Sequence, residues 1–127
     1  MKSIHVLLVD DENDFLTAYK RRLIRRNVEV SLASSGREAL RMIEWTDFDA
    51  VVLDIMMPEM SGIETLKRLK AVNPSIPVII LTGHANMEAL AQVSGGGAFD
   101  YLLKPVSTEE LYFKIMDAVR EARIGIH

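Results

Sequence analysis

Five polar residues that could do chemistry follow four separate apolar runs of the chain. The runs are HVLLV, DAVVL, PVIIL and DYLL, and the polar residues after them are Asp10, Asp11, Asp54, Thr82 and Lys104. Apolar runs of this length, separated by helical stretches, are typical of buried parallel strands whose carboxyl ends share one edge of a sheet. We therefore expect three carboxylates, one hydroxyl and one ammonium to meet there. Such a group of side chains suits a divalent cation and a phosphoryl group.

The carboxylates of Asp10, Asp11 and Asp54 are candidate ligands for Mg²⁺, which prefers oxygen donors and keeps several waters. Without a cation, three crowded carboxylates repel one another, and Lys104 neutralises at most one of them. Asp54 stands alone after the central run, so it is the candidate nucleophile that would form an acyl phosphate. Lys104 would then supply positive charge to the phosphoryl oxygens, and Thr82 would supply a hydroxyl donor.

The elements that position these residues alternate between strand and helix along the whole chain. The predicted strands are Ile4–Asp10, Val28–Ala33, Ala50–Asp54, Val78–Thr82 and Asp100–Leu103. The first intervening segment repeats Phe15, Tyr19 and Leu23 every four residues, which predicts a helix with one apolar face. Five strands alternating with five helices predict an α/β fold with a parallel sheet, right-handed crossovers and helices on both faces.

The usual strand order for such a fold is 2-1-3-4-5, and it places a ligand site beside the candidate residues. In this order the direction of the connections reverses between the first and third strands. Asp10 and Asp54 end these two strands, and ligands bind at the carboxyl ends of strands beside such a reversal. The sequence therefore predicts a three-layer sandwich whose site lies between Asp10 and Asp54.

Local sequence signals mark three helix starts, a tryptophan after the second helical pattern and a pair of glycines in the fourth helix. Three serine and glutamate pairs match the capping box at a helix start: Ser35 with Glu38, Ser61 with Glu64 and Ser107 with Glu110. Trp45 follows the second helical pattern, and we interpret it as a packing residue. Gly95 and Gly96 fall where helix formers are expected, so the fourth helix is predicted to be short and to fray at its end.

Composition limits the class of protein. The chain has 127 residues, 49% of them hydrophobic, a formal net charge of −3 and no cysteine. These values predict a single domain over residues 1–127, with a core at about 4–120 and a fraying tail, and they argue against direct nucleic-acid binding. The start of the chain does not resemble a signal peptide, and no apolar run approaches the ~20 residues of a membrane span. We therefore expect a cytoplasmic protein without a membrane segment.

The motifs together resemble the receiver domain of bacterial two-component response regulators, a flavodoxin-like fold. The resemblance rests on VLLVDDE at Asp10 and Asp11, VVLDIMMPEMSG at Asp54, IILTG at Thr82 and GAFDYLLKP, and it covers about residues 4–120. It implies that Asp54 takes a phosphoryl group from a phosphohistidine of a sensor histidine kinase or phosphotransfer protein. It further implies a signalling domain rather than an enzyme; homodimers and attached effector domains are common in the family.

The resemblance also implies roles for single residues. Asp11 and Asp54 would bind Mg²⁺ directly, Asp10 would act largely through water, and the backbone carbonyl of Met56 would be a further ligand. Thr82 and Lys104 would bind the phosphoryl oxygens. The switch residues would be Thr82 and Tyr101, which would remodel the face of the fourth helix, fifth strand and fifth helix. The bond between Lys104 and Pro105 would be cis.

Three other functions are compatible with parts of the pattern. A receiver-like module that binds a partner without phosphorylation is the first, although no acidic residue or lysine of the motifs is missing. A Mg²⁺-dependent phosphohydrolase would carry its Asp-x-Asp motif after the first strand and would need cap elements, which this chain lacks. A flavin-binding protein would need a phosphate loop rich in Ser, Thr and Gly after the first strand, where DDENDF would repel a phosphate.

Overall fold

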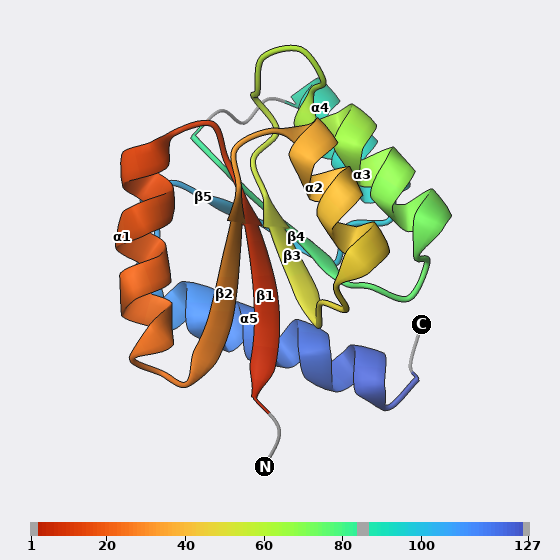
Figure 1. Cartoon of the computed structure of the whole chain (residues 1–127). Coiled ribbons are helices and arrows are strands. Elements are labelled where there is room, and N and C mark those ends of the chain that lie inside the picture. Colours follow the sequence, from red (N-terminus) through yellow and green to blue (C-terminus); the bar gives the residue numbers. More distant parts are fainter. Residues whose placement is uncertain (1–2, 84–86, 126–127) are drawn as a thin grey trace.

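The computed structural model describes residues 3–83 and 87–125 and shows a parallel sheet covered by helices on both faces (Figure 1). The strands are β1 (Ile4–Val9), β2 (Val28–Ala33), β3 (Ala50–Leu53), β4 (Val78–Thr82) and β5 (Asp100–Leu103). The helices are α1 (Asn13–Ile24), α2 (Gly36–Trp45), α3 (Gly62–Val72), α4 (Met87–Gly95) and α5 (Thr108–Arg123). All pairings are parallel and the strand order is β2-β1-β3-β4-β5, which confirms the predicted fold.

Two strands end one residue earlier than predicted, because their terminal aspartates begin turns. β1 ends at Val9 rather than Asp10, and β3 ends at Leu53 rather than Asp54. The Asp10 carboxylate accepts a hydrogen bond from the Glu12 N–H at 3.0 Å. An aspartate that accepts a bond from the N–H two residues later closes an Asx turn, which takes the chain out of the strand.

The sheet separates the core into two apolar layers. Its central strands carry apolar residues at successive positions, because both of their faces are buried. Val6 and Leu8 of β1 pack with α1 and α5 on one face, whereas Leu7 and Val9 pack with α2, α3 and α4 on the other. Figure 1 shows α1 and α5 together on one side of the sheet and α2, α3 and α4 on the opposite side. None of the helices in residues 3–83 and 87–125 combines the length and apolarity needed to cross a membrane.

The serine half of each predicted capping box is confirmed. Ser35, Ser61 and Ser107 are the N-caps of α2, α3 and α5, and each Oγ accepts a hydrogen bond from the N–H of the glutamate three residues later. The reciprocal bond differs from the prediction, because the carboxylates of Glu38 and Glu64 have other partners. Glu38 accepts instead from the Ser34 N–H at 2.6 Å, and Glu64 accepts from Arg68 one turn later at 2.8 Å.

The interpretation of Trp45 as a packing residue is wrong, since 87% of its surface is exposed. The buried face of α2 contains Ala39, with Met42 and Ile43 packed against the same core. Residues on one helical face recur every three or four positions, so the face that holds Ala39 and Ile43 continues beyond Trp45. The neighbouring aromatic residue Phe48 is buried in this layer instead.

The glycine run after α4 forms the end of that helix. Gly95 is the last helical residue, and Gly97 has a φ of 88°, in the left-handed region that favours glycine. The Ala98 N–H donates to the Val93 carbonyl at 3.3 Å, the six-to-one bond of a Schellman motif with Gly97 at its left-handed position. The run therefore stops the helix, while fraying of its last turn stays a prediction.

Candidate functional site

The loops after β1 and β3 bring the predicted acidic residues together at the carboxyl edge of the sheet. Backbone bonds anchor both loops, because the Asp10 N–H donates to the Ala33 carbonyl at 3.1 Å and the Asp54 N–H donates to the Val9 carbonyl at 3.0 Å. Ligand atoms of Asp10, Asp11 and Asp54 lie within 4.8 Å of one another. Asp10 and Asp54 are buried, whereas Asp11 is exposed.

The donor set fits a hard divalent cation. Three carboxylates offer oxygen ligands at a spacing that one ion can bridge, and Mg²⁺ takes such ligands together with water. The group contains no sulfur or imidazole, which softer metals prefer. Asp11 is open to solvent, so an ion could keep waters on that side.

The loop after Asp54 is fixed at both ends. The Asp54 carboxylate accepts a hydrogen bond from the Met56 N–H at 3.3 Å, and the Met56 side chain is exposed. At the other end, the Gly62 N–H donates to the Ile55 carbonyl at 2.7 Å. A Cβ at Gly62 would lie 2.0 Å from the Asp54 carbonyl oxygen, so the start of α3 presses directly on the backbone of Asp54. The Met56 carbonyl as a metal ligand stays a prediction.

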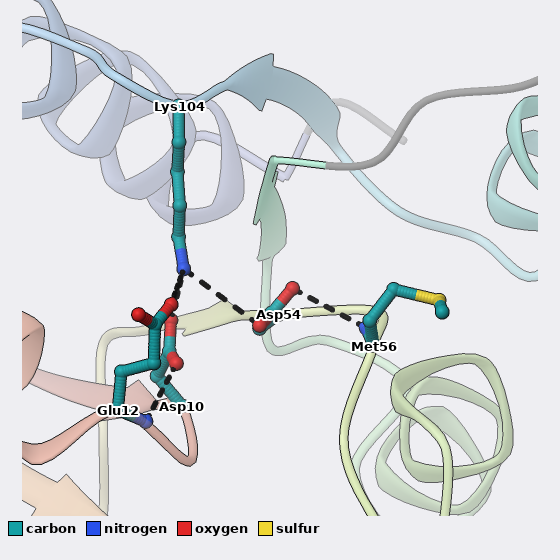
Figure 2. A network of polar contacts seen from close by, with 5 residues as sticks. All are labelled: Asp10, Glu12, Asp54, Met56 and Lys104. Carbon is teal, nitrogen blue, oxygen red and sulfur yellow. Dashed lines mark hydrogen bonds and ion pairs between the residues drawn. The ribbon is translucent and has the colours of Figure 1, made fainter.

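Lys104 comes from the loop after β5 and places its ammonium among the carboxylates (Figure 2). Its Nζ lies 2.6 Å from Asp10 Oδ2 and 3.7 Å from Asp54 Oδ2. The bond between Lys104 and Pro105 is cis, as predicted. Sequence reasoning brought Lys104 to this site and assigned it to the oxygens of a phosphoryl group on Asp54, whereas its shortest contact in the structure is with Asp10.

Two further residues contact Lys104, and sequence reasoning missed both of them. Glu12 Oε1 lies 3.2 Å from Lys104 Nζ, and the same Nζ lies 4.1 Å from the ring centroid of Phe15. A cation over an aromatic face at this distance makes a cation–π contact. The one sequence signal for Glu12 was its place directly after the acidic pair. Phe15 gave no such signal, because its spacing indicates only the apolar face of α1.

Burial and charge act together on the ionisable groups. Burial raises the pKa of the Asp10 carboxyl, and hydrogen bonds from Lys104 and from the Glu12 N–H offset that rise only in part. Burial alone would lower the pKa of the Lys104 ammonium, but the bond to Asp10 and the charges of Asp10 and Asp54 outweigh it and leave that pKa raised. Lys104 therefore stays charged at neutral pH.

The predicted switch residues lie on the neighbouring strands β4 and β5. Thr82 ends β4 with its side chain fully buried, and the strand register pairs it with Leu103. Tyr101 pairs with Ile80 and is exposed. The structure thus places both residues at adjoining strands near Lys104, while their coupled movement stays a prediction.

A comparison with protein families gives the site its context. The model of the response regulator receiver domain matches residues 6–116, a span that contains every motif residue discussed above. The chain belongs to this family. As a receiver domain of two-component signal transduction, it is a signalling domain rather than a classical enzyme.

Individual relatives agree with this assignment. The transcriptional regulatory protein ZraR of Klebsiella oxytoca is 37% identical over 98% of this chain, which spans 28% of that relative. The response regulator MprA of Mycolicibacterium vanbaalenii is 35% identical over 92% of this chain, which spans 51% of it. A CheY-like receiver domain structure from Methanospirillum hungatei JF-1 has a TM-score of 0.93 at 31% identity, with coverage of 96% of this chain and 98% of that one.

Proposed function

We propose that Asp54 accepts a phosphoryl group from a phosphohistidine of a sensor histidine kinase or a phosphotransfer protein, in a reaction that depends on Mg²⁺. One observation carries the proposal. Asp54 is a buried carboxylate at the centre of the carboxyl edge, within 4.8 Å of two other carboxylates and 3.7 Å from an ammonium. Two buried carboxylates beside an exposed one and a single cation are costly as a purely structural element, and this arrangement suits phosphoryl transfer.

In the proposed reaction a carboxylate oxygen of Asp54 attacks the phosphorus atom. An O–P bond forms, the P–N bond to the donor imidazole breaks, and the imidazole keeps the electron pair and takes up a proton. Lys104 offers an ammonium to the phosphoryl oxygens, and Thr82 offers its hydroxyl. Asp10, Asp11, Asp54 and the Met56 carbonyl would hold Mg²⁺, which neutralises charge on the transferred group.

The proposed output of this reaction is a change in the surface formed by α4, β5 and α5. Thr82 and Tyr101 would change together once a phosphoryl group draws the Thr82 hydroxyl towards Asp54. The exposed side chains of Tyr101 and Leu103 on β5 give this surface apolar area for a partner, which could be a second receiver or an effector domain. We assign the reaction to the cytoplasm, since a chain without cysteine suits a reducing compartment.

Intact-mass measurement after incubation with acetyl phosphate and Mg²⁺ tests the phosphoacceptor. The wild-type chain should gain about 80 Da, the mass of one phosphoryl group on a carboxylate nucleophile. Asp54→Ala should show no gain. Asp47→Ala removes an exposed carboxylate outside the site and should behave as the wild type does. A gain that persists in Asp54→Ala would refute the assignment, and no gain in the wild type would favour a module that acts without phosphorylation.

A further inference from the structure

Glu12 contacts the Lys104 ammonium at 3.2 Å, and no role follows for it from the reaction proposed above. We infer that Glu12 is a positioning residue that holds Lys104 away from Asp54 until a phosphoryl group is present. The inference rests on the proposed function, because it assigns Lys104 to the phosphoryl oxygens. On this inference, the contact between Glu12 and Lys104 shifts the equilibrium towards the unphosphorylated form.

The distances around Nζ rank its three acidic neighbours. Asp10 at 2.6 Å and Glu12 at 3.2 Å are within hydrogen-bond distance, whereas Asp54 at 3.7 Å is not. An ammonium has three N–H donors, and the resting structure directs two of them to Asp10 and Glu12. In Figure 2 the contacts from Nζ to Glu12 and Asp10 lie close together, and the contact to Asp54 runs apart from them. A lysine that binds oxygens on Asp54 must therefore loosen one of its present contacts.

Burial decides which contact gives way. The Asp10 side chain is 2% exposed, so loss of its cation would leave a buried charge unpaired. The Glu12 side chain is 67% exposed, and water can replace Lys104 there at little cost. Glu12 is thus the releasable partner, while Asp10 keeps its bond in both forms.

At the start of α1, the contact between Glu12 and Lys104 takes the place of a local capping hydrogen bond. Glu12 is the N-cap of α1, yet its side chain makes no capping hydrogen bond, unlike the serines that cap α2, α3 and α5. Glutamate is also not among the residues preferred at this position. The side chain instead reaches a lysine 92 positions later in the chain. Phe15, one turn along α1, covers the ammonium with its ring, so a single turn supplies both an acid and an aromatic contact.

Two substitutions at one position separate the contact from the charge. Glu12→Gln removes the negative charge. Glu12→Asp keeps the charge but shortens the side chain by one methylene, so the carboxylate no longer reaches Nζ. If Glu12 restrains Lys104, both variants should favour the form in which Lys104 binds a phosphoryl group. If only the negative charge near the metal matters, Glu12→Asp should behave as the wild type does.

The probe for the phosphorylated form is beryllofluoride, which mimics a phosphoryl group on a carboxylate and can be followed by ¹⁹F NMR. Titrations are made on the whole chain at a saturating Mg²⁺ concentration, because Glu12→Gln also removes charge near the metal. Both Glu12 variants should bind the probe about two- to fivefold more tightly, the range set by one partly exposed ion pair. Glu29→Gln, an equal charge change at an exposed position of β2, should leave the affinity unchanged. Wild-type affinity in Glu12→Asp would overturn the inference.

A second measurement needs no phosphoryl chemistry. In metal-free protein, ¹⁵N NMR reports how fast the Lys104 Nζ protons exchange with water, and exchange should be faster in both Glu12 variants than in the wild type. Unchanged exchange would show that Glu12 does not hold the ammonium, whatever the phosphorylation experiment gives. Faster exchange in a chain whose wild type gains no mass with acetyl phosphate would instead keep the contact and refute the proposed function.

Discussion

Asp10 and Asp11 are adjacent and chemically identical, yet the fold gives them different surroundings. Asp10 is buried and accepts bonds from the Lys104 ammonium and the Glu12 N–H. Asp11 is exposed, and within residues 3–83 and 87–125 it makes no hydrogen bond or ion pair. The first residue thus has a structural role in the metal-free fold, whereas the second has only its proposed role as a metal ligand.

Asp11→Ala should therefore leave the metal-free fold as stable as the wild type or slightly more stable. The gain should not exceed about 0.5 kcal/mol, because repulsion between an exposed carboxylate and its neighbours is screened by water and salt. Denaturant unfolding in the presence of a chelator measures it. Asp10→Ala is the matched comparison and should lose roughly 2 kcal/mol, since Lys104 loses its buried partner. A clear loss in Asp11→Ala would assign it a structural role in the turn before α1.

Single residues also show where sequence reasoning stops. The spacing of strand ends was sufficient to group Asp10, Asp11, Asp54, Thr82 and Lys104 at one edge, because strand topology fixes where backbones end. It could not rank the partners of the ammonium, because that depends on side-chain reach and burial. Glu12 was missed for the same reason.

At the scale of elements, the structure separates two glycines that the sequence treats alike. A Cβ on Gly95 would meet nothing within 4 Å, whereas a Cβ on Gly96 would lie 2.9 Å from Leu66 Cδ2 of α3 and 3.1 Å from the Gln92 carbonyl oxygen. Gly96 therefore allows the end of α4 to approach α3 closely. A double alanine substitution at Gly95 and Gly96 therefore combines two opposite effects.

Gly95→Ala should stabilise the domain by up to about 1 kcal/mol, because alanine loses less conformational entropy in a helix. Gly96→Ala should destabilise it by roughly 1 kcal/mol, since Leu66 is fully buried and can move only at the expense of its packing. Denaturant unfolding of the two single variants tests this. Amide hydrogen exchange over residues 87–97 should slow in Gly95→Ala alone. Equal effects of the two substitutions would contradict the contact with α3.

Element boundaries were predictable to within one residue where apolar runs meet turn residues, as at Val28–Ala33 and Val78–Thr82. The errors arose where side chains compete with the backbone ladder, as at Asp10, or where a helical face turns away from the core, as at Trp45. Periodicity identifies a buried face over several turns, but the last residue of a helix can lie on either side of it.

For the molecule as a whole, cation binding and folding should be linked. On the proposed function, three carboxylates that repel each other in the metal-free fold would become ligands of Mg²⁺, so the ion should bind the native state and not the unfolded chain. At a Mg²⁺ concentration ten times its Kd, the native state should gain about 1.4 kcal/mol, which corresponds to a rise in melting temperature of roughly 3–6 °C. The rise should be absent in Asp11→Ala. An equal rise in that variant would place the ion elsewhere.

The close approach of Gly62 to the Asp54 carbonyl has a consequence for mutational drift. Every amino-acid replacement that a single base change can make in a glycine codon adds a Cβ, and at this position any Cβ would collide with the backbone of Asp54, the proposed phosphoacceptor. No single-base missense change in this codon should therefore be neutral, although Gly62 contributes no side chain to the chemistry. In a saturation library selected for signalling, position 62 should tolerate as little change as Asp54, while the exposed Met56 between them should vary.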